Sequence, residues 1–218
     1  MTTLVELWPL FGLRVTCGPL ELRAVRDDDL PHVLEAVEAG IHEATRMPFL
    51  FPWTDAMGDT LRVNTLQHYW RARADVTPDK WSLPLGVWRD GGFVGIQEVA
   101  TTNFGVTRTG ETGSWLGRRF QGQGVGTLMR QAICALCFDH VSFTELTSGA
   151  FTDNPASRAV SRKVGYVDNG RVRYRRRDEL AVNQSLLLTP EAFVRPGHPV
   201  GVEGVAGVRR LLGIDDSI

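Results

Sequence analysis

The sequence is poor in cysteine and has few histidines. Its three cysteines, Cys17, Cys134 and Cys137, cannot form a complete set of disulfides, which favours the reducing environment of the cytoplasm. Cys134 and Cys137 have the spacing of a metal or redox pair, but no second pair and no nearby histidine completes such a site. We therefore interpret both as packed helix thiols. The five histidines show no metal-ligand spacing, so we predict no metal site.

Long apolar runs and an excess of charge of one sign are also missing. No stretch approaches the ~18 apolar residues of a membrane span. The first residues lack the basic start and apolar run of a signal peptide. The net charge is −1, which argues against a dedicated nucleic-acid binder even though 22 arginines accompany only two lysines. We therefore expect a cytoplasmic protein with no membrane or nucleic-acid partner.

The chain has enough apolar material for one substantial domain. Hydrophobic residues make up 43% of its 218 residues, and charged residues 22%. We expect residues 1–19 to be an irregular lead-in, residues 20–188 to be one domain and residues 189–218 to be an extension. Alternating and helical patterns predict strands at 20–26, 81–88, 93–101, 111–116, 143–151, 171–177 and 179–188, and helices at 27–40, 59–76, 127–140 and 154–165. This order indicates a mixed α/β sheet of the α+β type.

The segment with the strongest functional signal is a glycine-rich turn with the sequence "RRFQGQGVG". Glycines at positions 122, 124 and 126 precede a predicted helix, whose first amides form an anion site. A phosphate-binding P-loop would need a lysine after the last glycine, where Thr127 stands. A dinucleotide-binding turn would need the spacing Gly-x-Gly-x-x-Gly, whereas this loop has Gly-x-Gly-x-Gly. A tight turn without a ligand is a further alternative. Gln121 at the start of the loop suits a pyrophosphate that is bound by main-chain amides without a metal ion.

This loop resembles the Gln/Arg-x-x-Gly-x-Gly/Ala motif of the GNAT acyl-CoA-dependent N-acyltransferases. The strand sequence "ETGSWLG" and the helix sequence "NPASRAVSRKVGY" are similar to segments of the branch that acetylates the N-termini of ribosomal proteins. The loop "MPFLFPWT" stands where that branch has its acceptor-side loop. The resemblance covers Leu20 to Leu188 in the right order, and its motifs are specific in combination.

The resemblance implies a GNAT fold with a sheet splayed between the strands at 111–116 and 143–151. The pantetheine arm of CoA enters this splay and the pyrophosphate lies on the loop amides. On this basis the residues expected to contact CoA are Trp115, Leu116, Gln121, Gly122, Gln123, Gly124, Val125, Gly126, Thr127, Asn154, Ser157 and Lys163. Asn154 before Pro155 also fits a helix N-cap, and both roles can hold. The expected donor is acetyl-CoA, with succinyl-CoA as the alternative.

The expected reaction is direct attack of a primary amine on the thioester in a ternary complex. We predict that Ser157 assists the leaving thiolate, with Ser161 as the alternative, and that a backbone amide near Leu116 stabilises the oxyanion. A water relayed to Glu111 is the favoured base, and Glu98 is the second choice. We also expect a homo-oligomer. The alternative function is a non-catalytic module that binds acyl-CoA or associates with the ribosome.

The acceptor side is predicted from two further segments. Phe49 and Trp53 in the aromatic loop suit a wall of the acceptor pocket. Arg173 and Arg175 share one face of a strand, where they could bind a carboxylate or simply form a solvated sheet edge. Arg176 stands where we would align the catalytic glutamate of some related enzymes, so the identity of the base is open.

Overall fold

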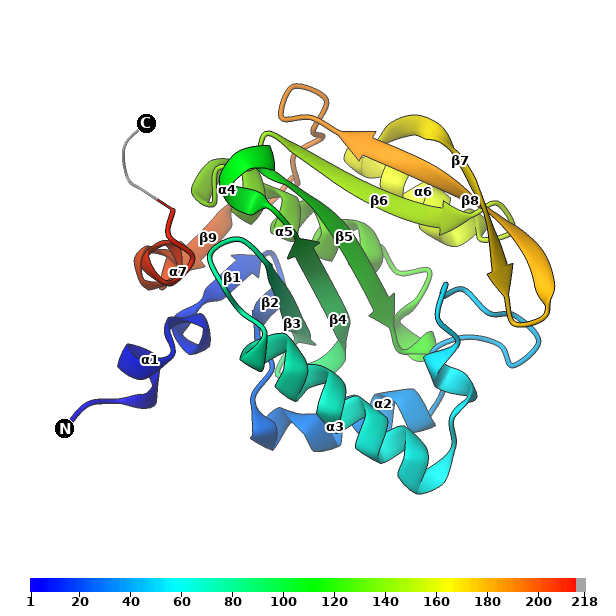
Figure 1. Ribbon diagram of the computed structural model, residues 1–218, viewed down its shortest axis with the longest axis horizontal. Coiled ribbons are helices and arrows are strands. Elements are labelled where there is room, and N and C mark those ends of the chain that lie inside the picture. Colours follow the sequence, from blue (N-terminus) through cyan, green and yellow to red (C-terminus); the bar gives the residue numbers. More distant parts are fainter. Residues whose placement is uncertain (215–218) are drawn as a thin grey trace.

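A single mixed β-sheet organises the chain. The computed structural model describes residues 1–214, and Figure 1 shows their sheet with helices on both sides. The strands are β1 (Arg14–Cys17), β2 (Leu20–Ala24), β3 (Trp81–Arg89), β4 (Gly92–Thr101), β5 (Thr109–Leu116), β6 (Glu145–Phe151), β7 (Val167–Arg176), β8 (Glu179–Leu188) and β9 (Val200–Glu203). The helices are α1 (Leu4–Leu7), α2 (Leu30–Glu38), α3 (Gly58–Ala74), α4 (Phe104–Thr107), α5 (Val125–His140), α6 (Pro155–Val164) and α7 (Val205–Leu211).

The strand order places the one parallel pair near the middle of the sheet. Within residues 1–214 the order is β7-β8-β6-β5-β4-β3-β2-β1-β9. Neighbouring strands are antiparallel except β5 and β6, which run parallel and are connected through α5. A parallel pair requires such a crossover. The mixed α/β class predicted from the sequence is confirmed.

The hairpin between β3 and β4 follows directly from the sequence. Asp90 and Gly91 both have positive φ angles, 51° and 79°. A two-residue turn that matches the twist of its strands requires this conformation at both positions, and Asp-Gly favours it. The hairpin predicted at "RDGG" is therefore confirmed, and it pairs β3 with β4.

Helices bury both faces of the sheet. On one face α5 packs through the fully buried Cys134 and Cys137, which are the packed helix thiols that the sequence predicts. On the other face α2 and α3 enclose a smaller cluster that includes Tyr69 and Ile96. Successive side chains of β5 therefore alternate between the α5 side and the α2–α3 side. Among residues 1–214, no helix is long and apolar enough to cross a membrane.

Both ends of the chain contribute strands, which the sequence analysis did not predict. β1 lies within the expected irregular lead-in and pairs with β2. The turn between them contains Gly18, at φ 55°, and Pro19, and these breaker residues obscure the alternation of the buried Val15 and Cys17. β9 lies within the expected extension and pairs with the other edge of β1. A four-residue strand such as β9 has too short a pattern to be recognised without its partner.

Candidate active site

Strands β5 and β6 separate after a short stretch of pairing. Their parallel register ends where Glu111 lies opposite Thr147, although both strands continue. Ser148 Oγ donates a hydrogen bond to the carbonyl oxygen of Thr112 at 2.9 Å and holds the strands together at the point of separation. Beyond it, the backbone of residues 114–116 has no strand partner on this side within the part of the chain that the structure describes, and the two arrows diverge in Figure 1. The predicted splay is present.

The glycine loop lies at the end of β5, next to the splay. Gly122 and Gly124 have φ angles of 73° and 81°, and a Cβ atom on either would meet nothing within 4 Å. The amides of residues 122–126 have no hydrogen-bond acceptor among residues 1–214. Helix α5 begins there without a side-chain cap. Free amides at a helix N-terminus, with open space beside them, can form an anion site.

The side chains of the loop hold its shape instead of facing the open space. Gln121 Nε2 donates to the carbonyl oxygens of Leu116 and Ile41 at 2.9 and 2.8 Å. Gln123 bonds within the loop and to the β3–β4 hairpin. The amide of Thr127 closes the first turn of α5. The loop therefore offers an anion its main-chain amides more than its glutamine side chains.

Helix α6 faces the loop across the splay. Asn154 Oδ1 accepts a hydrogen bond from the Ser157 amide at 3.2 Å, which confirms the predicted N-cap. The Asn154 backbone amide donates to the carbonyl oxygen of Phe151, whereas its side-chain nitrogen Nδ2 has no acceptor among residues 1–214 and can still donate to a ligand. A Cβ atom on Gly126 would lie 3.5 Å from Val160 and 3.6 Å from Leu116, so the start of α5 packs closely between α6 and β5.

The opposite face of β5 carries an open floor. Glu111, Gly113 and Trp115 lie on that face at alternate positions, and the register places Glu98 of β4 beside Gly113. A Cβ atom on Gly113 would meet nothing within 4 Å. A glycine inside a central strand marks a place where another molecule can approach the backbone closely. Two carboxylates and an aromatic ring surround this open position.

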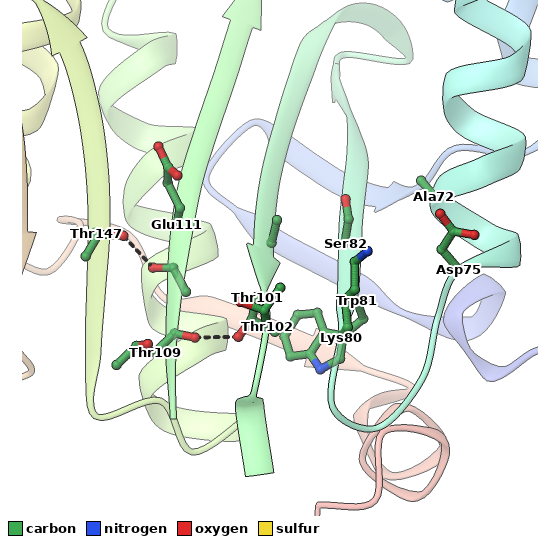
Figure 2. A pocket seen from close by; sticks show the side chains of 12 residues that line it. Ala72, Asp75, Lys80, Trp81, Ser82, Thr101, Thr102, Thr109, Glu111 and Thr147 are labelled. Atoms are coloured by element: carbon green, nitrogen blue, oxygen red, sulfur yellow. Dashed lines mark hydrogen bonds between the residues drawn. The ribbon is translucent and has the colours of Figure 1, made fainter. Parts of the chain in front are cut away.

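A cavity of about 420 Å³ extends from this face toward α3 (Figure 2). Glu111 lines it from β5, while Ser82 and Asp75 line it from the opposite side together with Lys80. Ser82 Oγ donates to the carboxylate of Glu98, which orients that side chain. The cavity therefore presents charges of both signs beside the open floor.

The electrostatics of this face suit proton transfer. Glu111 is exposed at the cavity wall, but the protein around its carboxylate removes part of the hydration and raises its pKa; the charge of Glu98 raises this pKa further, and Arg130 acts in the opposite direction. A carboxylate with a raised pKa is a better proton acceptor near neutral pH. Among residues 1–214, no three His, Cys, Asp or Glu side chains are placed to hold a metal ion.

Aromatic side chains link the 47–55 loop to the splayed strand. The ring centroids of Phe49 and Trp53 lie 5.3 Å apart, and those of Trp53 and Trp115 lie 6.3 Å apart. His42 packs edge-on against Phe49 at 5.7 Å. The structure thus brings both predicted acceptor-side residues to the end of β5, where they form a wall beside Trp115.

Comparison with known proteins identifies the family. Residues 19–167 match the family described as an acetyltransferase (GNAT) domain. The chain belongs to the GNAT acetyltransferase family. Over 133 residues it is 26% identical to the Bacillus subtilis protein named "Putative ribosomal N-acetyltransferase YdaF", a match that covers 61% of this chain and 68% of that protein.

Solved structures with this GNAT fold include ribosomal-protein acetyltransferases. Mycobacterium smegmatis RimJ in complex with CoA-disulfide has a TM-score of 0.71 at 22% identity, and the match covers 84% of this chain and 89% of that one. RimL, a ribosomal L7/L12 alpha-N-protein acetyltransferase, has a TM-score of 0.67 at 16% identity, with 80% and 94% covered. At these identities the likeness shows the shared fold.

Two arginines fasten the 47–55 loop of this GNAT domain to the β7–β8 hairpin. Arg176 forms a bidentate ion pair with Asp153 and donates to the carbonyl oxygen of Met47 at 3.0 Å. Arg177 forms a bidentate pair with Asp55 at 2.7 and 2.9 Å. Arg176, at the position aligned with a catalytic glutamate, is therefore engaged in holding the loop. These contacts hold the 47–55 loop in place beside the end of β5.

The other arginines of β7 lie away from the splay of the GNAT sheet. Arg173 and Arg175 are exposed on this edge strand, which β8 and β6 separate from β5. Arg175 pairs with Asp178. This placement favours the solvated edge, where charge prevents pairing with another sheet. A role of these two residues in binding the acyl group stays a prediction.

The two candidate acids differ in accessibility. Ser157 is half-buried in the first turn of α6, whereas Ser161 is only 1% exposed, and Lys163 is exposed near the end of the helix.

We expect Ser157→Ala to lower kcat about 10²-fold, the lower end for lost general-acid help, with acetyl-CoA affinity retained. Ser161→Ala should leave kcat near the wild-type value. Steady-state kinetics and calorimetry check both; near-normal kcat in Ser157→Ala would show that the assignment is wrong.

The sequence analysis missed several site residues. Gly113 had a signal, because a glycine inside an alternating strand indicates close backbone approach. Arg130 also had one, since it lies three and four residues before the buried Ile133 and Cys134 and so shares the apolar face of α5. The Arg177–Asp55 ion pair and the hydrogen bond from Arg176 to the Met47 carbonyl oxygen each join residues more than a hundred positions apart, so they have no local signal.

Proposed function

We propose that this chain transfers an acetyl group from acetyl-CoA to the α-amino group of a protein N-terminus, by direct attack in a ternary complex. One observation carries the proposal: β5 has an unpaired edge and a free-amide loop for the donor, and an open, acid-lined floor at Gly113 for the acceptor. A thioester along this strand and an amine over its other face would meet at the splay. Holding them at ~3–3.5 Å is the main requirement of the reaction.

Donor binding uses backbone groups on this proposal. The amides of residues 122–126 would hold the pyrophosphate, assisted by the dipole of α5. The pantetheine arm would pair with the free edge of residues 114–116, as a further strand would. The side-chain nitrogen of Asn154, at the start of α6, would donate a hydrogen bond to it. Among residues 1–214, the loop amides and the Asn154 side-chain nitrogen have no hydrogen-bond acceptor and the edge of residues 114–116 has no strand partner, although the Leu116 carbonyl oxygen accepts from Gln121 Nε2. At the loop amides CoA would therefore replace water without displacing a protein hydrogen bond.

The chemistry requires three charge movements. The incoming ammonium must lose a proton before its nitrogen can attack, and Glu111 with its raised pKa would accept that proton through a water. A backbone amide near Leu116 would stabilise the oxyanion of the tetrahedral intermediate. The thiolate would leave with the electron pair of the C–S bond, with the Ser157 hydroxyl beside it.

The acceptor class follows from the cavity walls. Glu111 and Asp75 attract a cationic amine, whereas Lys80, the exposed Thr102 and the half-buried Thr109 suit the carbonyl groups of a peptide. A polyamine would gain nothing from Lys80, because like charges repel. The names of the RimL and YdaF relatives, which refer to ribosomal and alpha-N-protein acetylation, point the same way. A cytoplasmic location and a homo-oligomer remain part of the proposal.

A donor and acceptor screen tests the function. We expect release of CoA thiol and a peptide mass gain of one acetyl group when acetyl-CoA is mixed with peptides that have free N-termini. Matched controls are the same peptides with blocked N-termini, blocked peptides that contain lysine, a polyamine, and succinyl-CoA as donor. Turnover of polyamines alone would reject the acceptor class. Acetyl-CoA binding without thiol release from any amine would favour the non-catalytic module.

A further inference from the structure

A buried arginine lies at the point where β5 and β6 separate. Arg130 of α5 is only 4% exposed. Its Nη1 donates to Thr112 Oγ1 at 3.2 Å and to Ser148 Oγ at 3.1 Å, its Nη2 donates to Ser114 Oγ at 2.9 Å, and its Nε donates to Gln97 Oε1 at 3.4 Å. One guanidinium therefore holds side chains from three strands, including both strands of the splay.

The positive charge of Arg130 has no negative partner on its side of the sheet. Every acceptor of its hydrogen bonds is a neutral hydroxyl or amide, and no carboxylate among residues 1–214 lies within ion-pair distance. Burial raises the pKa of Cys134 to about 12 and the pKa of Tyr166 well above its ordinary value, so both neighbours stay uncharged. Glu111 projects from the opposite face of β5. A buried, unpaired charge is costly unless something else compensates for it.

A hydrogen bond links the Arg130 guanidinium to Ser114, which lies in the open part of the splay. The Ser114 hydroxyl oxygen accepts from Arg130, so its own hydrogen is free to donate. Ser114 stands in the part of β5 that lacks a strand partner, next to Trp115. The second hydrogen on Arg130 Nη2 also has no acceptor among the described residues. Both donors lie where β5 and β6 separate, at the inner end of the opening that would receive the pantetheine arm.

We propose that Arg130 is a positioning residue for acyl transfer, whose charge acts through the Ser114 hydroxyl to stabilise the anions that form in the splay. This inference rests on the proposed function. The amine nitrogen forms a bond to the carbonyl carbon, the oxygen becomes an oxyanion, and the C–S bond then breaks with its electron pair on sulfur. The amine proton goes to the Glu111 relay. A preorganised cation in a water-poor site stabilises such charge more strongly than water does.

The thiol of bound CoA provides a test that needs no acceptor. We expect it to titrate at a pH at least about one unit higher in Arg130→Met than in the wild type, because an opposite charge favours the thiolate. Arg130→Lys should restore most of the difference. The measurement is thiolate absorbance of the CoA complex against pH, with alkylation rates as a second readout. Since no amine is involved, the result is independent of the proposed acceptor.

Steady-state kinetics complete the test. With a good acceptor, Arg130→Met should lower kcat about 10²-fold while the Kd for acetyl-CoA changes less than about threefold, because the interaction strengthens in the transition state. Ser114→Ala keeps the guanidinium and the fold and should shift thiol titration in the same direction by a smaller amount. It therefore replaces Arg130→Met if that variant does not fold.

Two outcomes would overturn the proposal. One is a bound thiol that titrates identically in the wild type, Arg130→Met and Ser114→Ala, which would leave Arg130 a purely structural strut. The other is a wild-type preference for succinyl-CoA that disappears in Arg130→Met with the thiol titration unchanged. That result would make Arg130 a binder of the acyl carboxylate instead.

Discussion

Replacement of Gly124 with valine is expected to weaken acetyl-CoA binding about a hundredfold or more. Gly124 has a φ of 81°, a conformation that a β-branched residue rarely adopts, and its Cβ position opens into the space above the loop amides. A side chain there would keep the pyrophosphate from the amides of residues 122–126. Loss of two charge-assisted hydrogen bonds at ~1.5–3 kcal/mol each accounts for such a change. Isothermal calorimetry with CoA measures it directly.

Two glycine variants serve as matched controls for this prediction. Gly170 of β7 has a φ of 90° and open space around its Cβ position, so Gly170→Val introduces a similar backbone strain far from the loop. Gly126→Ala places a methyl group in ordinary contact with α6 and β5 and away from the open space. Both should retain most of the CoA affinity. If a folded Gly124→Val variant binds CoA normally, the pyrophosphate does not bind to this loop and the prediction is wrong.

Replacement of Glu111 with glutamine is expected to lower kcat about 10²–10⁴-fold with little change in CoA affinity. The amide is nearly isosteric but cannot accept the amine proton, and lost general-base help typically has this magnitude. Asp75→Asn is the matched control for kcat: Asp75 lines the same cavity away from Gly113, so losing its charge should raise the KM for the amine and leave kcat near the wild-type value. Steady-state kinetics with a peptide acceptor measure both. A near-normal kcat in Glu111→Gln would show that Glu111 is not the base and would leave Glu98 as the candidate.

The pH dependence of kcat/KM separates these two carboxylates. A base must be deprotonated to act, so activity should fall as the pH drops through the raised pKa of Glu111. Partial loss of hydration is the larger cause of that raised pKa, and the negative charge of Glu98 adds to it. Glu98→Gln removes the like charge, so the acidic limb of the profile should move to lower pH while the maximal rate stays high. A limb that disappears in Glu98→Gln would instead identify Glu98 as the base.

Local patterns were reliable where short-range chemistry dictates the backbone. The Asp-Gly turn before β4 and the Asn154–Pro155 start of α6 each require only neighbouring residues, and both occur as predicted. The prediction that residues 1–19 are irregular was wrong for β1. Gly18 and Pro19 are residues that usually interrupt regular structure, but here they form the turn of a hairpin. The edge location of Arg173 and Arg175 depends on strand order, which no local pattern reveals.

The sequence by itself determined the class of fold, the glycine loop and the chemistry that the loop can support. Glycine spacing, an absent lysine and a helix start depend on backbone geometry within a few residues. Only the tertiary structure decided which distant groups meet. It placed Glu98 beside Gly113, fastened the 47–55 loop through Arg176 and Arg177, and buried Arg130 at the splay with no carboxylate of residues 1–214 within ion-pair distance. Such meetings depend on strand order and burial, because side chains far apart in the chain become neighbours only when the sheet assembles.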